Sequence, residues 1–144
     1  MTTQPSQNAG NKIDTRSAKT LSTLDKNFAS ALEKSWPDIT GDAQKDGYSI
    51  IAITGRRSQA EQDALYAQGR TTPGPIVTWT KHSRHLDGLG VDFGLFRGGY
   101  YKDDTEPMQT FNTYQKIAII VCDDHPQIRW LGAIGDPCHF EWRV

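Results

Sequence analysis

The sequence lacks several features that mark other classes of protein. It has no excess of charge of either sign, because 16 basic residues stand against 17 acidic ones in 144 and leave a formal charge of -1. Binding to nucleic acid through overall charge is therefore not expected. The longest apolar run, residues 117–122, is too short to span a bilayer, so no membrane insertion is expected.

Cysteine is scarce and no secretory signal is recognisable. Cys122 and Cys138 do not form a C-x-x-C pair, and we expect two reduced, partly buried thiols rather than a disulfide. The N-terminus is polar and has no apolar segment of the secretory type, which predicts a soluble product made in the cytoplasm.

The length fits one ordinary domain with a real core. Residues 1–13 are rich in Thr, Gln, Ser, Asn and Gly, and we expect them to form a flexible lead-in. Residues 14–144 then form the single domain.

Three stretches predict helices. Apolar residues recur at helical spacing over residues 15–36 and 111–122. The first helix is expected to end at Trp36, because the residue before Pro37 is pushed away from helical angles. A capping-box pattern predicts a shorter helix over residues 58–68.

Four short stretches rich in β-branched and aromatic residues predict strands, over residues 48–54, 89–96, 128–131 and 139–142. Residues 70–75 and 97–107 are expected to be loops. Together these elements predict an α+β fold, with a small, mostly antiparallel sheet and helices packed on one side.

Two of the four histidines stand out as metal ligands. Asp92 follows His85 by seven residues inside an apolar stretch, where a carboxylate needs a partner. Asp136 precedes His139 by three residues on a predicted turn. Two imidazoles and one carboxylate leave a fourth position for water, the pattern of catalytic zinc, and this predicts zinc in a surface cleft. The alternative is that Asp92 pairs with an arginine and the histidines are incidental.

These residues resemble two motifs of the LAS metallopeptidases, a group that includes lysostaphin-type enzymes, D-alanyl-D-alanine peptidases and the hedgehog signalling fold. Residues 83–92 are similar to S-x-H-x-x-G-x-A-x-D, and residues 136–140 to the second motif, with an acid three residues before the last zinc ligand. Upstream segments at 54–58 and 62–70 extend the likeness. The combination, covering about residues 50 to 142, is most similar to phage endolysins that are L-alanyl-D-glutamate peptidases.

The chain departs from these motifs at three positions. Gly90 replaces the usual alanine of the first motif, and Arg56 stands where an aromatic residue is common. Cys138 lies inside the second motif, so a thiolate ligand to zinc is kept as an alternative.

The resemblance implies roles for the site residues. His85, Asp92 and His139 are expected to bind one Zn²⁺ ion, and Asp136 to act as the general base. Arg57 is expected to stabilise the developing oxyanion or to bind a substrate carboxylate, the alternative being a surface ion pair.

Two further residues are predicted to contact substrate. Ser83 either bonds a substrate carboxylate or caps the loop that positions His85. Gln62 either faces the cleft or is solvated on its helix. His82 and His125 are left outside the site.

The function that the resemblance implies is a zinc-dependent endopeptidase that cleaves the L-alanyl-D-glutamate bond of peptidoglycan stem peptides. A phage endolysin of this kind is expected to be a monomer that another factor delivers to the host cell wall. One alternative is a D-alanyl-D-alanine carboxypeptidase. An alternative of another class is a non-catalytic zinc-containing protein that binds peptidoglycan or takes part in phage assembly.

Overall fold

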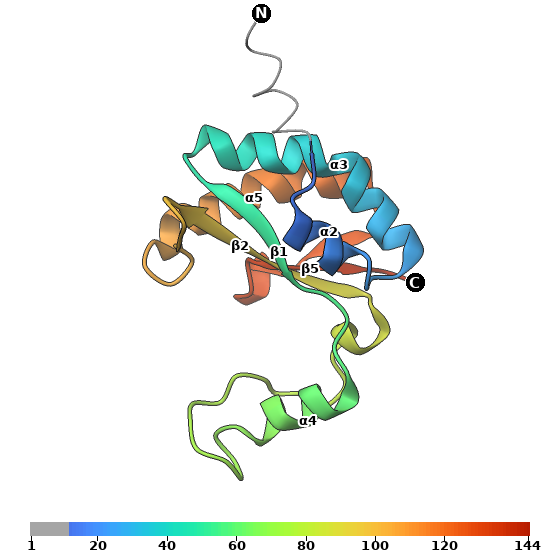
Figure 1. The fold of residues 1–144 in the computed structure, drawn as a ribbon, viewed down its shortest axis with the longest axis vertical. Helices are drawn as coiled ribbons and strands as arrows, with labels where there is room; N and C mark the ends of the chain where they lie inside the picture. The colour runs from blue at the N-terminus through green and yellow to red at the C-terminus, as the bar shows by residue number, and fades with distance from the viewer. Residues whose placement is uncertain (1–11) are drawn as a thin grey trace, which may run out of the picture.

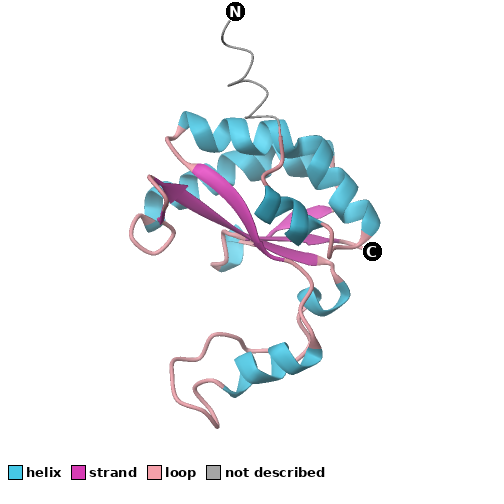
Figure 2. Cartoon of the chain, in the orientation of Figure 1, coloured by secondary structure: helices cyan, strands magenta, loops and turns pink. Residues whose placement is uncertain are grey.

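One five-stranded sheet organises the computed structural model, which describes residues 12–144 (Figures 1 and 2). Its main strands, which pair antiparallel, lie in the order β1 (Ser49–Thr54), β2 (Gly90–Arg97), β5 (His139–Trp142) and β4 (Ile128–Trp130). The two-residue β3 (Tyr100–Tyr101) pairs with β2, inside a segment predicted as loop.

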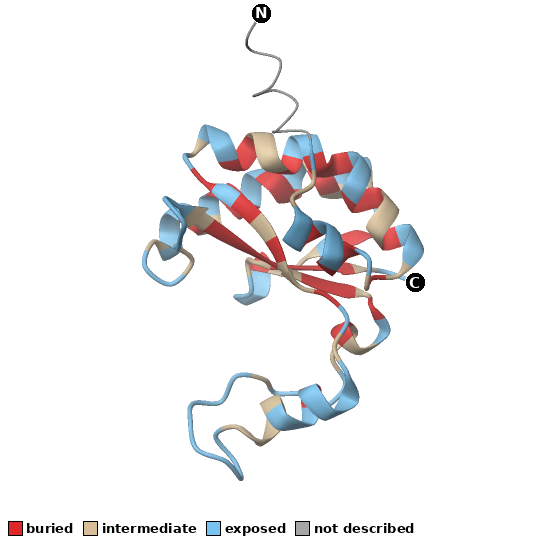
Figure 3. Cartoon of the chain, in the orientation of Figure 1, coloured by how far each residue is buried: buried red, intermediate tan, exposed pale blue. Residues whose placement is uncertain are grey.

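Two long helices, α3 (Lys26–Lys45) and α5 (Pro107–Asp124), cover one face of this sheet (Figure 1). The burial pattern in Figure 3 places the core between these helices and the strands. Along β2, Val91, Phe93 and Leu95 are buried in that core, and because side chains alternate along a strand, Asp92 faces the other side. The predicted α+β class, with a small antiparallel sheet and helices on one side, is confirmed.

The predicted helix over residues 15–36 is wrong in both its continuity and its end. The structure has α2 (Thr15–Leu21) and then α3, which begins after Asp25, whose carboxylate accepts hydrogen bonds from Asn27 N and Phe28 N. Pro37 lies inside α3. Proline in a helix interior costs about 3 kcal/mol.

Packing on both sides of Pro37 explains why α3 continues through it. Phe28 and Trp36 before the proline, and Ile39 and Ala43 after it, are buried. Fully burying a large apolar side chain contributes about 1.5–3 kcal/mol, so these contacts together outweigh the local cost.

The short α2 protects the exposed edge of the sheet. Ser17, which is fully buried, accepts a hydrogen bond from Ala52 N of the edge strand β1 at 2.9 Å. The backbone N–H of an edge strand would otherwise lack a partner. Just before α2, Ile13 packs against the core, whereas residues 1–11 of the predicted lead-in lie outside the described residues.

A separate projection carries α4 (Gln59–Ala67), and we call residues 59–82 the arm. It stands away from the sheet and the long helices (Figure 1). Its predicted capping box is confirmed, because Glu61 N donates to Ser58 Oγ at 3.1 Å and Ser58 N to Glu61 Oε1 at 2.9 Å. In residues 12–144 no helix has the length and apolar character needed to cross a membrane.

The hydrogen bond between α2 and the sheet edge is testable. Ser17→Ala leaves the buried N–H of Ala52 without its partner, which we expect to lower the free energy of unfolding by about 1–3 kcal/mol. Urea denaturation measures this change. The matched control is Ser22→Ala, at an exposed position where the hydroxyl bonds only to Lys19 O; equal effects of the two substitutions would contradict the assignment.

Candidate metal centre

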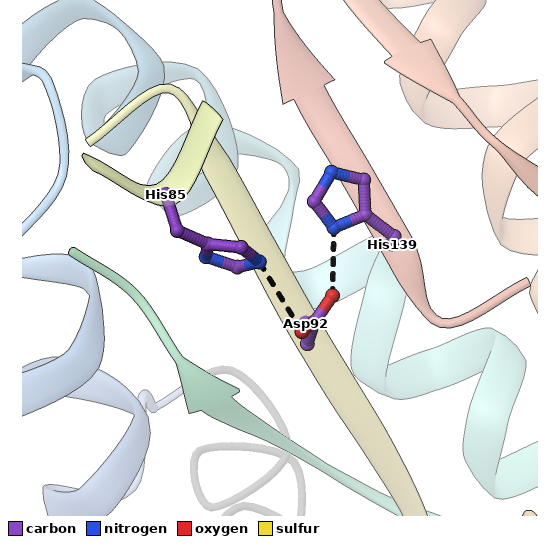
Figure 4. Close-up of side chains that lie close together, drawn as sticks. All are labelled: His85, Asp92 and His139. Carbon is purple, nitrogen blue, oxygen red and sulfur yellow. Dashed lines mark hydrogen bonds and ion pairs between the residues drawn. The ribbon is translucent and has the colours of Figure 1, made fainter. Parts of the chain in front are cut away.

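Three elements bring His85, Asp92 and His139 together on the sheet face opposite the long helices. His85 lies on the short 3-10 helix η1 (Arg84–Asp87), Asp92 on β2, and His139 begins β5 (Figure 4). In the β2–β5 register Asp92 stands directly opposite His139, and directly opposed residues of antiparallel strands project from the same face.

The two imidazoles converge on one carboxylate. His139 Nδ1 lies 2.7 Å from Asp92 Oδ1, and His85 Nε2 lies 3.2 Å from Asp92 Oδ2. One ligand atom from each of the three residues falls within 4.8 Å of the others. Two nitrogens and one oxygen at this spacing suit a tetrahedral ion with one position left for water.

The conformation of η1 fixes the direction of His85. Ser83 caps this helix, and its hydroxyl accepts a hydrogen bond from His85 N at 3.2 Å. This contact agrees with the alternative in which Ser83 caps the segment that positions His85. His85 Nδ1 lies 2.8 Å from Gly55 O. Since a carbonyl only accepts, Nδ1 donates to Gly55 O, and Nε2 is the nitrogen that faces Asp92.

The glycine of the first motif allows η1 to approach its neighbours. Gly88 ends η1 with a φ of 71°, in the left-handed region that favours glycine. A Cβ atom there would lie 2.7 Å from Arg56 Nη2 and 3.0 Å from Asp25 N. Arg56 Nε also donates a hydrogen bond to Thr23 O, which keeps the guanidinium packed against the end of η1.

The charges of the three residues stabilise one another. Burial alone raises the pKa of Asp92, but the hydrogen bonds and positive charges of His139 and His85 outweigh it and hold that pKa well below its usual range. Burial by itself lowers the pKa of His139. The hydrogen bond to Asp92 and the negative charges of Asp92, Asp136 and Glu141 have the larger, opposite effect, so the pKa of His139 is raised. The carboxylate is thus ionised and available as a ligand.

Asp136 lies at the same cleft, on the turn before β5. The residue as a whole is exposed, but its carboxyl group is partly shielded from water. This loss of solvation, followed by the negative charge of Asp92, raises the pKa of Asp136. The thiol of Cys138 donates to Asp136 Oδ1 at 3.6 Å. Burial, followed by the charges of Asp92 and Asp136, raises the pKa of Cys138. Within residues 12–144 the ligand atoms that come together belong to His85, Asp92 and His139, and Cys138 is not among them.

Arg57 reaches the cleft with a buried support behind it. Its Nη1 donates to Gln62 Oε1 at 2.7 Å, and Gln62 Nε2 donates to Thr80 O at 2.7 Å. Gln62 is completely buried and does not line the cleft. Neither expectation for Gln62, a contact with substrate or a solvated side chain, describes this position; it joins Arg57 to the loop of the arm at Thr80.

A cleft of about 480 Å³ contains the site. Its walls include six of the seven predicted site residues, all but Gln62, and the arm supplies one wall. The lining residues are Arg57, Leu65, Val77, Thr78, Thr80, His82, Ser83, Arg84, His85, Asp92, Leu131, Asp136, His139 and Glu141.

Sequence reasoning missed some lining residues. His82 was placed outside the site but lines the cleft, whereas His125 is the C-terminal cap of α5. Glu141 was not considered, although its spacing of two from His139 on a predicted strand puts both on one face.

Comparisons with known proteins agree with the motifs. No family model matches the chain. It is 46% identical over 55 residues to the peptidoglycan L-alanyl-D-glutamate endopeptidase CwlK of Bacillus subtilis (strain 168). That segment is 37% of this chain and 33% of the relative, so the likeness spans about a third of the relative's length.

The crystal structure of the Serratia marcescens L-Ala D-Glu endopeptidase ChiX has a similar fold, with a TM-score of 0.65 and 20% sequence identity. The superposition covers 89% of this chain and 86% of that one. With the segment shared with CwlK, it confirms the predicted resemblance to the LAS-type peptidases.

The support that Gln62 gives to Arg57 and the arm is testable. Gln62→Leu keeps the volume but leaves Thr80 O and Arg57 without their partner, so we expect a loss of about 1–3 kcal/mol in unfolding free energy. Urea denaturation reads the loss, and hydrogen exchange should show faster exchange in the arm. Gln115→Leu, at an exposed position on α5, is the control and should change neither measurement.

Proposed function

We propose that the protein is a zinc-dependent endopeptidase that hydrolyses the L-alanyl-D-glutamate bond of peptidoglycan stem peptides. The observation that carries the proposal is the convergence of His85, Asp92 and His139 in a cleft that also holds Asp136 and Arg57. The names of CwlK and ChiX describe this reaction for those proteins. In this proposal the protein acts as a monomeric phage endolysin, brought to the host wall by another factor.

The donor set fits zinc. Two imidazole nitrogens and one carboxylate oxygen, from residues that all line the cleft, match the three protein ligands of catalytic zinc sites. Zinc bound there supplies a Lewis acid that polarises the scissile carbonyl and makes water more acidic.

Asp136 is proposed as the general base. It lies in the cleft beside the ligands, and its raised pKa makes it a better proton acceptor than an ordinary surface aspartate. It takes a proton from the attacking water and passes it to the departing amine of D-glutamate.

Arg57 is proposed to bind the negative charge that develops on the scissile carbonyl oxygen, or a carboxylate of the stem peptide. The bond to Gln62 uses one N–H of its guanidinium. Within residues 12–144 no other hydrogen bond engages this guanidinium, so its remaining N–H groups can form the paired hydrogen bonds that suit an oxyanion or a carboxylate. In this proposal Gln62 does not contact the substrate; it orients the guanidinium of Arg57, which does.

The bond that is cleaved can be read from products. Incubation of purified sacculi with the zinc-loaded protein should release peptides that begin at D-glutamate, detected by mass spectrometry, and a chelator should stop the release. Loss of terminal D-alanine alone would instead identify a carboxypeptidase. A protein that binds zinc and yields no new termini would support a binding or assembly role.

The role of Asp136 separates catalysis from metal binding. Asp136→Asn removes the proton acceptor but none of the three ligands, so we expect turnover to fall by about 10²–10⁴-fold while the zinc content is unchanged. Turnover is measured on sacculi and zinc by elemental analysis. Asp123→Asn, on the exposed side of α5, makes the same chemical change as a control, and an active Asp136→Asn enzyme would refute the assignment.

A further inference from the structure

We propose that Glu141 is a positioning residue that holds His139 in the orientation and tautomer needed for metal binding, and that Arg84 holds Glu141 in turn. The inference rests on the proposed function, because it takes His139 as a ligand. It concerns two side chains to which the LAS motifs give no role.

The strand geometry places Glu141 beside the ring. Glu141 and His139 are two residues apart on β5 and therefore project from the same face of the sheet. Glu141 Oε2 lies 3.4 Å from His139 Nε2. The other ring nitrogen, Nδ1, lies 2.7 Å from Asp92 Oδ1, so the imidazole lies between two carboxylates.

The two carboxylates favour different positions of the ring proton. Metal binding through Nδ1, the nitrogen that faces Asp92 and His85, requires that this nitrogen carry no proton. The neutral ring then has its proton on Nε2, where Glu141 can accept it. Without Glu141, the nearby Asp92 favours the proton on Nδ1, which blocks the ligand position.

His85 has an equivalent support on its outward nitrogen. Its Nδ1 lies 2.8 Å from Gly55 O, and its Nε2 faces Asp92. Both candidate ligands therefore have a protein oxygen near the nitrogen that points away from Asp92, at 2.8 Å in His85 and at 3.4 Å in His139. Such outer partners fix ring orientation and tautomer in metal sites.

Arg84 supplies the charge that a buried glutamate needs. The side chain of Glu141 is only 12% exposed, and Arg84 Nε lies 3.8 Å from its Oε2. Arg84 Nη2 also donates to Trp142 O at 2.8 Å, which ties η1 to β5. Because η1 carries His85 and β5 carries His139, the same arginine links the elements that bear the two imidazoles.

Gly90 leaves room for this arrangement. It stands opposite Glu141 in the β2–β5 register. A Cβ atom at Gly90 would lie 2.9 Å from His139 Cε1, closer than such contacts normally come. The departure from alanine at this motif position therefore gives the ring the space it occupies between Asp92 and Glu141.

The experiment measures metal affinity as well as activity. Zinc dissociation constants are determined for wild type, Glu141→Ala and Glu141→Gln by competition with a chromophoric chelator. We expect Glu141→Ala to weaken zinc binding by about 10- to 100-fold. Glu141→Gln should weaken it less, because its amide oxygen can still accept the N–H of His139. Glu33→Gln, at an exposed position on α3, is the matched control and should bind as wild type does.

Two further measurements separate positioning from a structural role. Cobalt absorption spectra should change in Glu141→Ala, since the imidazole is no longer held in place. The melting temperature of the metal-free protein reads folding alone. A lowered melting temperature with unchanged zinc affinity would overturn the inference. If Glu141→Ala does not fold, the zinc affinities of Glu141→Gln and Arg84→Met test the inference instead. Wild-type zinc affinity in both variants would refute the positioning role of Glu141.

The outcomes also distinguish this inference from the proposed function. Wild type that cleaves sacculi, together with unchanged zinc affinity in Glu141→Ala, refutes the role of Glu141 alone. Zinc affinity that depends on Glu141 in a protein that cuts no peptide bond supports that role and refutes the endopeptidase. Wild type that binds no zinc refutes both.

Discussion

The placement of one carboxylate constrains the rest of the site. Asp92 lies on β2 between residues that fill the core, and the alternation of the strand turns it toward the opposite face. A largely buried negative charge requires partners, and His85 and His139 provide them at 3.2 and 2.7 Å. Strand pairing fixes one of these histidines and η1 fixes the other, so the same contacts that stabilise the charge also form a metal site.

Around this centre, buried polar groups hold the side chains that reach the cleft. Gly55 O orients His85, and Gln62 supports Arg57. The first bond joins segments 30 positions apart in sequence, and the second joins the arm to the site. The arm, which stands apart from the core, is tied to Arg57 through Gln62 and forms one wall of the cleft. The position of this wall and the direction of Arg57 are therefore coupled.

Local sequence was sufficient where local interactions decide the structure. The capping box at Ser58 and the strands near β1, β2 and β5 were predicted, because capping and side-chain alternation involve residues a few positions apart. The continuous helix through residues 15–36 was wrong. Its break depends on a cap at Asp25, and its passage through Pro37 depends on core contacts that no local rule includes.

The types and spacing of residues along the chain are enough to predict the candidate ligands His85, Asp92 and His139. Which groups surround these ligands depends on how distant segments pack. Gln62 is a buried support because Thr80 O comes to meet it, and His85 Nδ1 finds an acceptor because Gly55 O lies beside it. Such contacts depend on chain segments far apart in sequence, and the free energy of folding the whole core is what brings them within hydrogen-bonding distance.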